Sequence, residues 1–361
     1  MKKWIALSLI LLMMLNGCSS QNTQPSEDTH NNNNGSMTNS SDNQTIDVPN
    51  TKELFAMDTY MTLKVYGDNS SKVLDQCEME IKNLESIFNV NDTDSDIYHI
   101  NSRSGSVVQV DQNTAAVIEK ATDMSEKTDG ALDISIYPVL REWGFTTGEY
   151  SVPDEKTLQN LLQFVDYHNI NVNGVNVNIP EAYAIDFGSI AKGYASDQLV
   201  SILNENGISS ALLNLGGNVY ALGTKPSGEK WTVGIQDPTN STDNICIVKV
   251  SDRAVITSGN YERFFERDGK KYWHIIDPKT GFPADNGIIS ATVIGKNGAE
   301  CDALSTALFV MGTDKAIKYC QQHRDIDAIL VTKDKKVYLT DGISDSAEVS
   351  DGIEYSTIAR N

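Results

Sequence analysis

Three oxygen-bearing side chains near the C-terminus of the chain have the spacing of a metal site. Asp302, Ser305 and Thr306 stand at positions i, i+3 and i+4, and on a helix this spacing places them on one face. Carboxylate and hydroxyl oxygens suit Mg²⁺ or Ca²⁺ better than zinc, and Mg²⁺ usually accompanies a phosphate-bearing substrate. The pattern predicts a Mg²⁺ site, although Asp302 could also cap a helix over 303–311.

A histidine that precedes this group in the sequence is the first candidate for acid–base chemistry. His274 precedes an Asp277-Pro278 turn, and an unperturbed histidine has a pKa close to neutral. It could act as a general base or only stabilise charge. Taken alone, a structural histidine beside the turn is the better interpretation.

A second motif, DFGSIAKGYA at 186–195, could bind phosphate. Gly188 permits a tight turn, Ser189 is expected to begin a helix, and the N–H groups at a helix start bind anions. Lys192 would then reach the same phosphate. The glycine spacing fits neither a P-loop nor a dinucleotide fingerprint, and a capped helix with a surface lysine is an equally good interpretation.

Two further segments combine small residues with apolar ones. Gly216-Gly217 in NLGGNVYALG at 214–223 could let the backbone approach a ligand, but a plain hairpin turn is the more probable interpretation. GALDIS at 130–135, followed by Trp143-Gly144-Phe145, could line a pocket for a flat ring. Aromatic residues more often belong to the core, and that interpretation is favoured here.

The elements that must position these motifs follow from the spacing of apolar residues. Helices are predicted over 71–88, 113–128, 153–164, 189–204, 301–311 and 314–322. Strands are predicted over 52–66, 211–215, 231–235, 245–250, 254–257, 288–294, 328–331 and 337–339, with a hairpin over 172–179 and an irregular segment over 130–145. The absence of a regular βαβ rhythm predicts an α+β fold.

Composition narrows the class of partner. The formal net charge is −20, which argues against nucleic acid and against binding to anionic lipid. Apart from Cys18, the four cysteines Cys77, Cys246, Cys301 and Cys320 show no metal-like spacing. They could form disulfides or remain buried thiols, and the sequence does not choose between these.

The N-terminus has the features of an export signal. Lys2 and Lys3 precede a short apolar run that ends in Leu15-Asn16-Gly17-Cys18, which resembles a bacterial lipobox. We expect residues 1–17 to be a signal peptide and Cys18 to be lipidated, against the alternative of an ordinary secretory signal. Residues 18–50 form an Asn/Ser-rich tether. The protein would then be extracytoplasmic and held on the bacterial cell membrane by its lipid anchor alone, with a folded domain over 51–361.

In series, the motifs resemble the ApbE family of FAD:protein FMN transferases. The resemblance covers about residues 51–345 and implies a single ApbE-like α+β domain with mixed, mainly antiparallel sheets and flanking helices, possibly in two lobes. It rests on AMDTYMTL at 56–63, GALDISIYPVLREWGF at 130–145, DFGSIAKGYASD at 186–197, LLNLGGNVYALG at 212–223, SGNYERFF at 258–265, HIIDPKTGFP at 274–283 and CDALSTALFVMG at 301–312.

The resemblance implies roles for individual residues. Asp302 and His274 would be catalytic. FAD, the substrate, would be bound by Met57, Ala131, Leu132, Asp133, Asp186, Lys192, His274 and Ile275. Mg²⁺ would be held by Ser189, Asp302, Ser305 and Thr306. Many family members have an aspartate at the position of Ser305, so weaker or more hydrated Mg²⁺ coordination is expected here.

The implied reaction transfers FMN from FAD to a threonine of an acceptor protein and releases AMP. The acceptor would carry a Ser/Asp-Gly-Ala-Thr/Ser-like motif and would be a membrane redox subunit or a flavin-carrying lipoprotein. The alternatives are a FAD pyrophosphatase that releases FMN and AMP, and a flavin-binding lipoprotein without catalysis. A covalently flavinylated electron carrier is a further alternative, against which the chain shows no acceptor motif of that kind.

Overall fold

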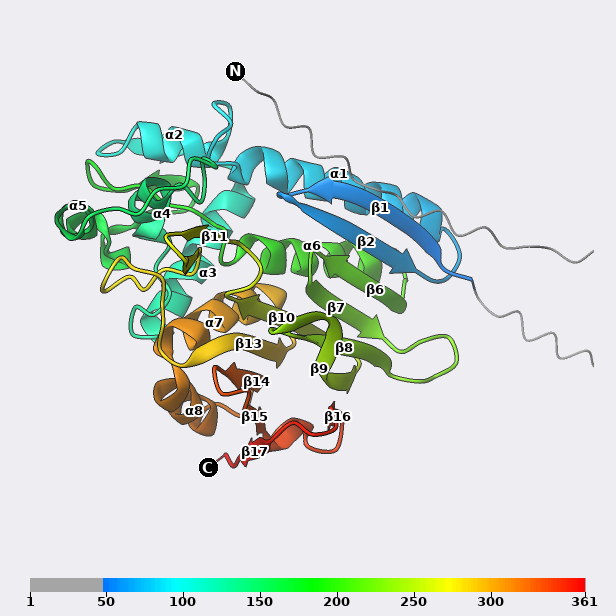
Figure 1. Ribbon diagram of the computed structural model, residues 1–361. Coiled ribbons are helices and arrows are strands. Elements are labelled where there is room, and N and C mark those ends of the chain that lie inside the picture. The colour runs from blue at the N-terminus through cyan, green and yellow to red at the C-terminus, as the bar shows by residue number, and fades with distance from the viewer. Residues whose placement is uncertain (1–47, 361) are drawn as a thin grey trace, which may run out of the picture. The chain divides into compact units, whose positions relative to one another are not determined.

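The fold is built on a nine-stranded sheet (Figure 1). The computed structural model describes residues 48–360, so the predicted signal peptide, Cys18 and nearly all of the tether lie outside the described residues. Neighbouring strands pair antiparallel except for the parallel β15–β17 pair. The order is β1 (Asn50–Ala56), β2 (Thr59–Val65), β6 (Ser210–Leu215), β7 (Asn218–Gly223), β10 (Arg253–Gly259), β13 (Ile288–Gly295), β14 (Asp327–Thr332), β15 (Val337–Thr340) and β17 (Tyr355–Ile358).

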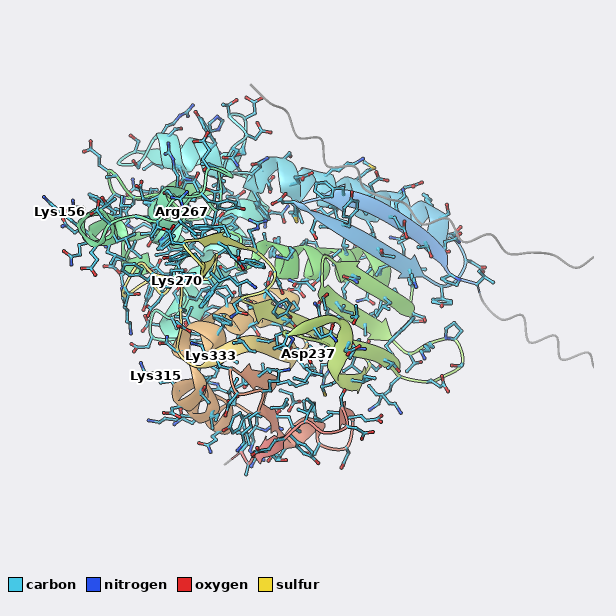
Figure 2. All side chains as sticks on the ribbon, in the orientation of Figure 1. Lys156, Asp237, Arg267, Lys270, Lys315 and Lys333 are labelled. Carbon is cyan, nitrogen blue, oxygen red and sulfur yellow. The ribbon has the colours of Figure 1, made fainter. Side chains whose placement is uncertain are left out.

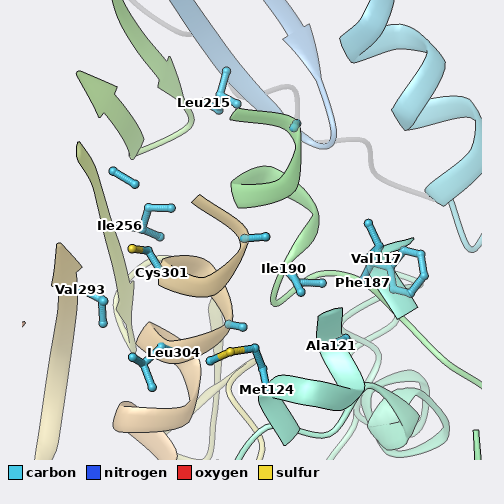
Figure 3. Packing of buried hydrophobic residues seen from close by; sticks show 14 of the residues in the cluster. Val117, Ala121, Met124, Phe187, Ile190, Leu215, Ile256, Val293, Cys301 and Leu304 are labelled. Carbon is cyan, nitrogen blue, oxygen red and sulfur yellow. The ribbon is translucent and has the colours of Figure 1, made fainter. Parts of the chain in front are cut away.

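Helices cover one face of this sheet. They are α1 (Ser70–Phe88), α3 (Gln112–Lys127), α6 (Ala191–Glu205), α7 (Gly298–Met311) and α8 (Thr313–Gln322). The apolar stripe of each helix joins the inward residues of the strands in one core. Figure 3 shows part of this core, where Met124 of α3 points toward α7 and Ile256 and Val293 approach from the strands.

A smaller sheet covers the opposite face. Its order is β16 (Ala347–Val349), β9 (Asn240–Val250) and β8 (Trp231–Asp237). The central strands are therefore buried on both faces: Ala328 and Leu330 of β14 pack against the helices, while Ile329 and Val331 pack against the smaller sheet. Such strands read as continuous apolar runs rather than as alternating ones.

The remaining elements lie beside the main sheet. They are α2 (Asp96–Ser102), α4 (Tyr137–Trp143), α5 (Glu155–Leu161), a sheet of β3 (Val107–Gln109), β5 (Asn176–Asn178) and β4 (Asn171–Asn173), and the β11 (Phe264–Arg267) and β12 (Lys270–Trp273) hairpin. An aromatic cluster around the fully buried Trp143 joins α4 to this hairpin. The indole N–H donates to the Gly281 carbonyl at 2.8 Å, which ties the turn after His274 to the same cluster.

Glycines bring helices α6 and α7 into close contact. A Cβ at Gly193 would overlap the carbonyl oxygen of Gly298, so no other residue fits there without moving a helix. Asp197 of α6 accepts the N–H groups of Gly298 and Ala299 at 2.6 and 2.9 Å, which satisfies two free donors at the start of α7. This packing fixes the positions of the residues that follow on both helices.

The α+β prediction and its mainly antiparallel sheets are confirmed, with differences in detail. The strand expected over 52–66 is the β1–β2 hairpin, and the helix expected from Ser189 begins two residues later, at Ala191. The helix expected from Cys301 begins at Gly298 and is capped by Asn297, so the interpretation of Asp302 as an N-cap is wrong. The segment expected to be irregular contains α4.

The four cysteines of the described part are free and buried. Burial raises the pKa of Cys77 and Cys320 to about 12 and that of Cys246 to about 11. The pairing that the sequence left open is therefore absent among residues 48–360. In the same range, no helix is long and apolar enough to cross a membrane.

Candidate active site

A cavity of about 1080 Å³ opens between the ends of β1, β7, β8 and β10 and the start of α6. All but one of the FAD and metal residues named from the sequence line it, although they come from distant parts of the chain. The residues that line it are Met57, Ala131, Leu132, Asp133, Asp186, Ser189, Lys192, His274, Ile275, Asp302 and Thr306. Ser305 is fully buried behind the wall.

Two neighbouring hairpin turns form one wall. Met57-Asp58 joins β1 to β2 with φ of 49° and 60°, and Gly216-Gly217 joins β6 to β7 with φ of 66° and 95°. Glycine adopts this left-handed backbone freely, whereas Met and Asp do so with strain. The Met57 N–H donates to Glu85 Oε1 at 2.7 Å, which helps to hold the strained turn.

Asp302 is held by the α6–α7 packing. Its Oδ2 accepts the N–H of Gly193 at 2.8 Å, and the residue is nearly buried. The other carboxylate oxygen, Oδ1, has no hydrogen-bond partner among the described residues, and Asp302 lines the cavity. One oxygen therefore fixes the side chain and the other remains for a ligand.

The hydroxyl groups beyond Asp302 form a chain. Ser305 Oγ donates to the Asp302 carbonyl at 2.8 Å, so the Ser258 hydroxyl must be the donor in their 2.8 Å contact. Ser258 Oγ also lies 3.2 Å from Thr306 Oγ1, and both of these residues line the cavity. Ser305 thus supports this wall, while Ser258 and Thr306 present oxygens to the cavity.

The turn before α6 brings a carboxylate and a lysine to the cavity. Asp186 Oδ1 accepts the Gly188 N–H at 2.8 Å and so shapes the turn. Burial raises the pKa of Asp186, and the positive charges of Arg263 and Lys192 partly oppose this. Ser189 lies in the turn and Lys192 in the first turn of α6. The Ala191 and Gly193 N–H groups already donate to the Phe187 carbonyl and to Asp302, so a hydroxyl, a cation and the Lys192 N–H meet at one place.

His274 is oriented by backbone. Its Nδ1 lies 3.1 Å from the Arg263 carbonyl, which can only accept, so Nδ1 carries the proton and Nε2 has a free lone pair. Burial and the Arg263 charge lower the pKa of His274 to about 4. The expectation of a base with an ordinary histidine pKa is therefore wrong, and the imidazole is neutral at neutral pH.

Asp133 supports the wall from behind. Its Oδ1 accepts the N–H and hydroxyl of Ser135 at 2.8 and 2.6 Å, and Oδ2 accepts the Tyr167 N–H at 3.1 Å. Burial raises the pKa of the carboxyl. The neighbouring Ala131 and Leu132 line the cavity. Trp143 belongs to the core, as favoured from the sequence, whereas Phe145 is buried and also lines the cavity.

Ser258, Glu262 and Arg263 line the cavity but received no role from the sequence. Desolvation by the surrounding protein raises the pKa of the Glu262 carboxyl to about 7, although the residue remains accessible to water at the cavity mouth. Arg263 forms an ion pair of 2.5 Å with Asp58 across the mouth, and its carbonyl holds His274. The segment SGNYERFF contains all three, and this concentration of polar residues after an apolar strand was the available signal.

The donor set fits Mg²⁺ that shares its coordination with a substrate. No group of three His, Cys, Asp or Glu side chains within residues 48–360 could hold a metal alone. Asp302, Thr306 and Ser189 offer one carboxylate and two hydroxyls to the cavity. Mg²⁺ commonly combines one or two carboxylates with substrate phosphates and water, so this set suits such a site.

Comparisons with known proteins agree on one family. Residues 57–330 match the model of the ApbE family. The chain is 35% identical over 289 residues to the FAD:protein FMN transferase of Treponema pallidum, covering 75% of this chain and 80% of that protein. It is 32% identical to that of Klebsiella pneumoniae, with 79% and 89% covered.

Solved structures give the same result. The crystal structure of the ApbE protein from Thermotoga maritima has a TM-score of 0.75 at 31% identity and covers 84% of this chain and 97% of its own. The apo form of the flavinyl transferase ApbE from Pseudomonas stutzeri has a TM-score of 0.72 at 28% identity, with 80% and 92% covered.

Proposed function

This chain belongs to the ApbE family, and on that basis we propose that it is a Mg²⁺-dependent enzyme that transfers FMN from FAD to a threonine hydroxyl of an acceptor protein and releases AMP. One observation carries the proposal. A single cavity joins a phosphate-binding helix start, a carboxylate with one free oxygen and an oriented imidazole. That combination suits transfer of a phosphoryl group.

FAD would lie across the cavity with its two ends on different walls. The flavin ring suits the wall of Met57, Ala131 and Leu132. The pyrophosphate suits the ammonium group and the backbone N–H of Lys192 at the start of α6, beside the Arg263 guanidinium. Asp186 would accept hydrogen bonds from nucleotide hydroxyls, because a carboxylate beside phosphate needs an intervening cation.

Asp302, Thr306 and Ser189 would hold Mg²⁺, and Ser305 would support them. When bound, Mg²⁺ neutralises charge on the phosphate oxygens and orients the leaving group. Asp302 is held in place by the Gly193 N–H, so its free oxygen is already positioned before substrate arrives.

The acceptor hydroxyl would attack the FMN-side phosphorus. A new phosphorus–oxygen ester bond forms, the bridging bond to the AMP phosphate breaks, and the hydroxyl proton must leave. His274 Nε2 has a free lone pair for this proton. Bound pyrophosphate brings negative charge close to the imidazole, which raises the pKa of His274 from its low value toward neutral.

We propose that the enzyme works outside the cytoplasm, anchored through lipidated Cys18, and that residues 18–50 separate the anchor from the domain. Its acceptor would be a protein with a Ser/Asp-Gly-Ala-Thr/Ser-like motif, such as a membrane redox subunit or a flavin-carrying lipoprotein. Mass spectrometry of the protein purified from membranes tests the anchor, with Cys18→Ala as the variant that should be released in soluble form.

The transfer is tested with purified residues 19–361, FAD and Mg²⁺, with and without a peptide that contains Asp-Gly-Ala-Thr. AMP release together with an FMN-sized mass gain on the peptide threonine is the expected result. AMP without peptide modification would establish a FAD pyrophosphatase instead, and bound FAD without AMP would leave a flavin-binding protein. His274→Ala should lower the rate of transfer strongly at saturating Mg²⁺. Near-normal turnover would exclude His274 both as a general base and as a group that stabilises charge.

A further inference from the structure

The second substrate needs a place at the mouth of the cavity. The proposed reaction requires an acceptor hydroxyl close to a phosphorus inside the cavity, at roughly 3–3.5 Å in a reactive geometry. A threonine on a folded surface cannot enter so deeply unless its backbone comes with it. The acceptor must therefore offer an extended segment, and the cavity rim must bind that segment.

The strand β8 has an unpaired edge. It is the last strand of the order β16-β9-β8 and pairs only with β9 in the part of the chain that the structure describes. Three of its residues, Gly234, Ile235 and Gln236, line the cavity (Figure 2 labels Asp237, the last residue of the strand). The open edge therefore runs into the mouth of the reaction site.

Backbone hydrogen bonds show which groups of β9 face which neighbour. The Lys249 N–H donates to the Ser346 carbonyl, and the Ser350 N–H donates to the Ile245 carbonyl. The odd-numbered residues of β9 thus face β16. Because backbone groups alternate in direction along a strand, the even-numbered residues of β9 face β8.

The pairing with β9 determines which backbone groups of β8 have no hydrogen-bond partner. Val233 pairs with Val248, an even-numbered residue of β9, so Val233 faces β9 and its neighbours Thr232 and Gly234 face away. The N–H and C=O groups of these two residues have no hydrogen-bond partner within residues 48–360. Gly234 has no side chain of its own, the Asn244 amide packs against it on one face of the sheet, and both Thr232 and Gly234 are exposed.

The edge strand β1, which also reaches the cavity, is protected. β1 ends the nine-stranded sheet, and Phe55 of β1 lines the cavity. However, Lys52 of β1 is paired with Asp75 and Glu78 of α1 at 2.5 and 2.6 Å. A charged residue on an edge strand discourages addition of another strand. No residue of β8 from Trp231 to Gln236 is charged.

We propose that the acceptor protein docks as an additional strand on the free edge of β8, so that main-chain hydrogen bonds to Thr232 and Gly234 carry its threonine into the cavity. This inference rests on the proposed function, since it names the docking site of the second substrate. Strand addition derives affinity from main-chain groups and tolerates different side chains.

The test combines one substitution with a matched control. Thr232→Pro removes a free N–H on the β8 edge outside the cavity, and Pro is tolerated where an edge N–H has no partner. Ala347→Pro removes an outward N–H at the opposite edge of the same sheet, because Ala347 pairs with Val248 and therefore faces away from β9. We expect Thr232→Pro to raise the KM for the Asp-Gly-Ala-Thr peptide at least tenfold and Ala347→Pro to change it less than twofold.

Two direct measurements separate docking from catalysis. FAD affinity of Thr232→Pro, followed by flavin fluorescence, should match the wild type. Hydrogen exchange of the wild-type, FAD-loaded enzyme should show slower exchange at Gly234 when the peptide is added. Protection without transfer would support the docking site and overturn the proposed function.

The opposite outcomes also distinguish the docking proposal from the proposed function. Transfer with no protection at β8 and an unchanged KM for Thr232→Pro would overturn the docking proposal and leave the function intact. A KM effect from Tyr60→Ser but none from Thr232→Pro would place the acceptor on the exposed aromatic pair Phe55 and Tyr60 instead. If the wild type neither binds nor modifies the peptide, both proposals fail.

Discussion

Asp197 of α6 and Asp302 of α7 each accept backbone N–H groups of the other helix, but only Asp302 lines the cavity. Asp197 of α6 uses both carboxylate oxygens to accept N–H groups at the start of α7. Asp302 of α7 uses one oxygen to accept the Gly193 N–H of α6 and leaves the other free. A buried, hydrogen-bonded carboxylate is thus structural when both oxygens are used. It is available for chemistry when one oxygen is spare.

The largest expected effect comes from the spare oxygen. Asp302→Asn should keep the bond from Gly193, because the amide oxygen still accepts, but it removes the charge that would bind Mg²⁺. We expect transfer to fall by on the order of 10²-fold or more, about 3 kcal/mol of transition-state stabilisation. The rate of FMN transfer across a Mg²⁺ titration measures it. Asp197→Asn is the control. Its amide has one oxygen for the two N–H groups, so the variant should lose some stability but, once folded, transfer at close to the normal rate. Equal losses of transfer rate in both variants would contradict the distinction between the two carboxylates.

The next effect is on stability, through the contact between the two helices. Gly193→Ala places a methyl group against the Gly298 carbonyl, and overpacking of this kind costs about 2–3 kcal/mol. Urea unfolding measures the loss. Gly298→Ala should behave similarly, because its Cβ would meet the Gly193 carbonyl at 2.5 Å. A change below about 0.5 kcal/mol in both variants would mean that the helices separate easily and do not fix either carboxylate.

A smaller effect depends on pH. Burial raises the pKa of Asp197 to about 6, from 3.8 for an unperturbed aspartate, so its folded form binds a proton more tightly than the unfolded chain does. Its contribution to stability is fully present below pH 3.8 and is lost as the pH rises through about 6. Relative to Asp197→Asn, the wild type should lose about 1–2 kcal/mol between pH 4 and 7, after allowance for partial solvent screening. Urea unfolding of both proteins at several pH values gives this difference, and a constant difference would contradict it.

The smallest effect concerns the residue beside Asp302. Ser305→Asp adds a negative group behind the wall that carries Asp302 and Thr306, and the expected result is Mg²⁺ affinity a few-fold tighter, about 1 kcal/mol. A Mg²⁺ titration of transfer activity measures it. Without Mg²⁺ the added carboxylate is buried and unpaired, so the thermal midpoint of the variant should depend on Mg²⁺ more strongly than that of the wild type. Unchanged Mg²⁺ dependence would mean that Ser305 is too far behind the wall to matter.

The long elements of the fold were predictable, because the period of apolar residues decides them. The helix expected over 71–88 is α1, with one residue added at its start. The β1–β2 turn was not predictable, since Met57-Asp58 contains neither glycine nor asparagine and adopts its backbone only with support from Glu85. The short strands β11 and β12 depend on the aromatic cluster around Trp143 rather than on their own pattern.

The motifs predicted which segments meet at the site but not how each residue is used. The i, i+3, i+4 spacing correctly put Asp302, Ser305 and Thr306 on α7. The bond from the Ser305 hydroxyl to the Asp302 carbonyl is local, but the spacing could not show that Ser258 of a distant strand completes the hydroxyl chain. Nor could the spacing show that Asp302 keeps one oxygen free while Asp197 uses both. The direction of each carboxylate is set by the glycine contact between the two helices.

The four buried thiols have a practical consequence for experiments on this enzyme. With thiol pKa values of 11 or more for Cys77, Cys246 and Cys320, almost no thiolate exists at neutral pH. Within residues 48–360, the fold contains no disulfide that a reductant could break. A single cysteine introduced on the surface, for example by Thr232→Cys, should therefore react alone with a maleimide dye in the purified domain. The arrival of an acceptor at β8 could then be followed in real time by fluorescence.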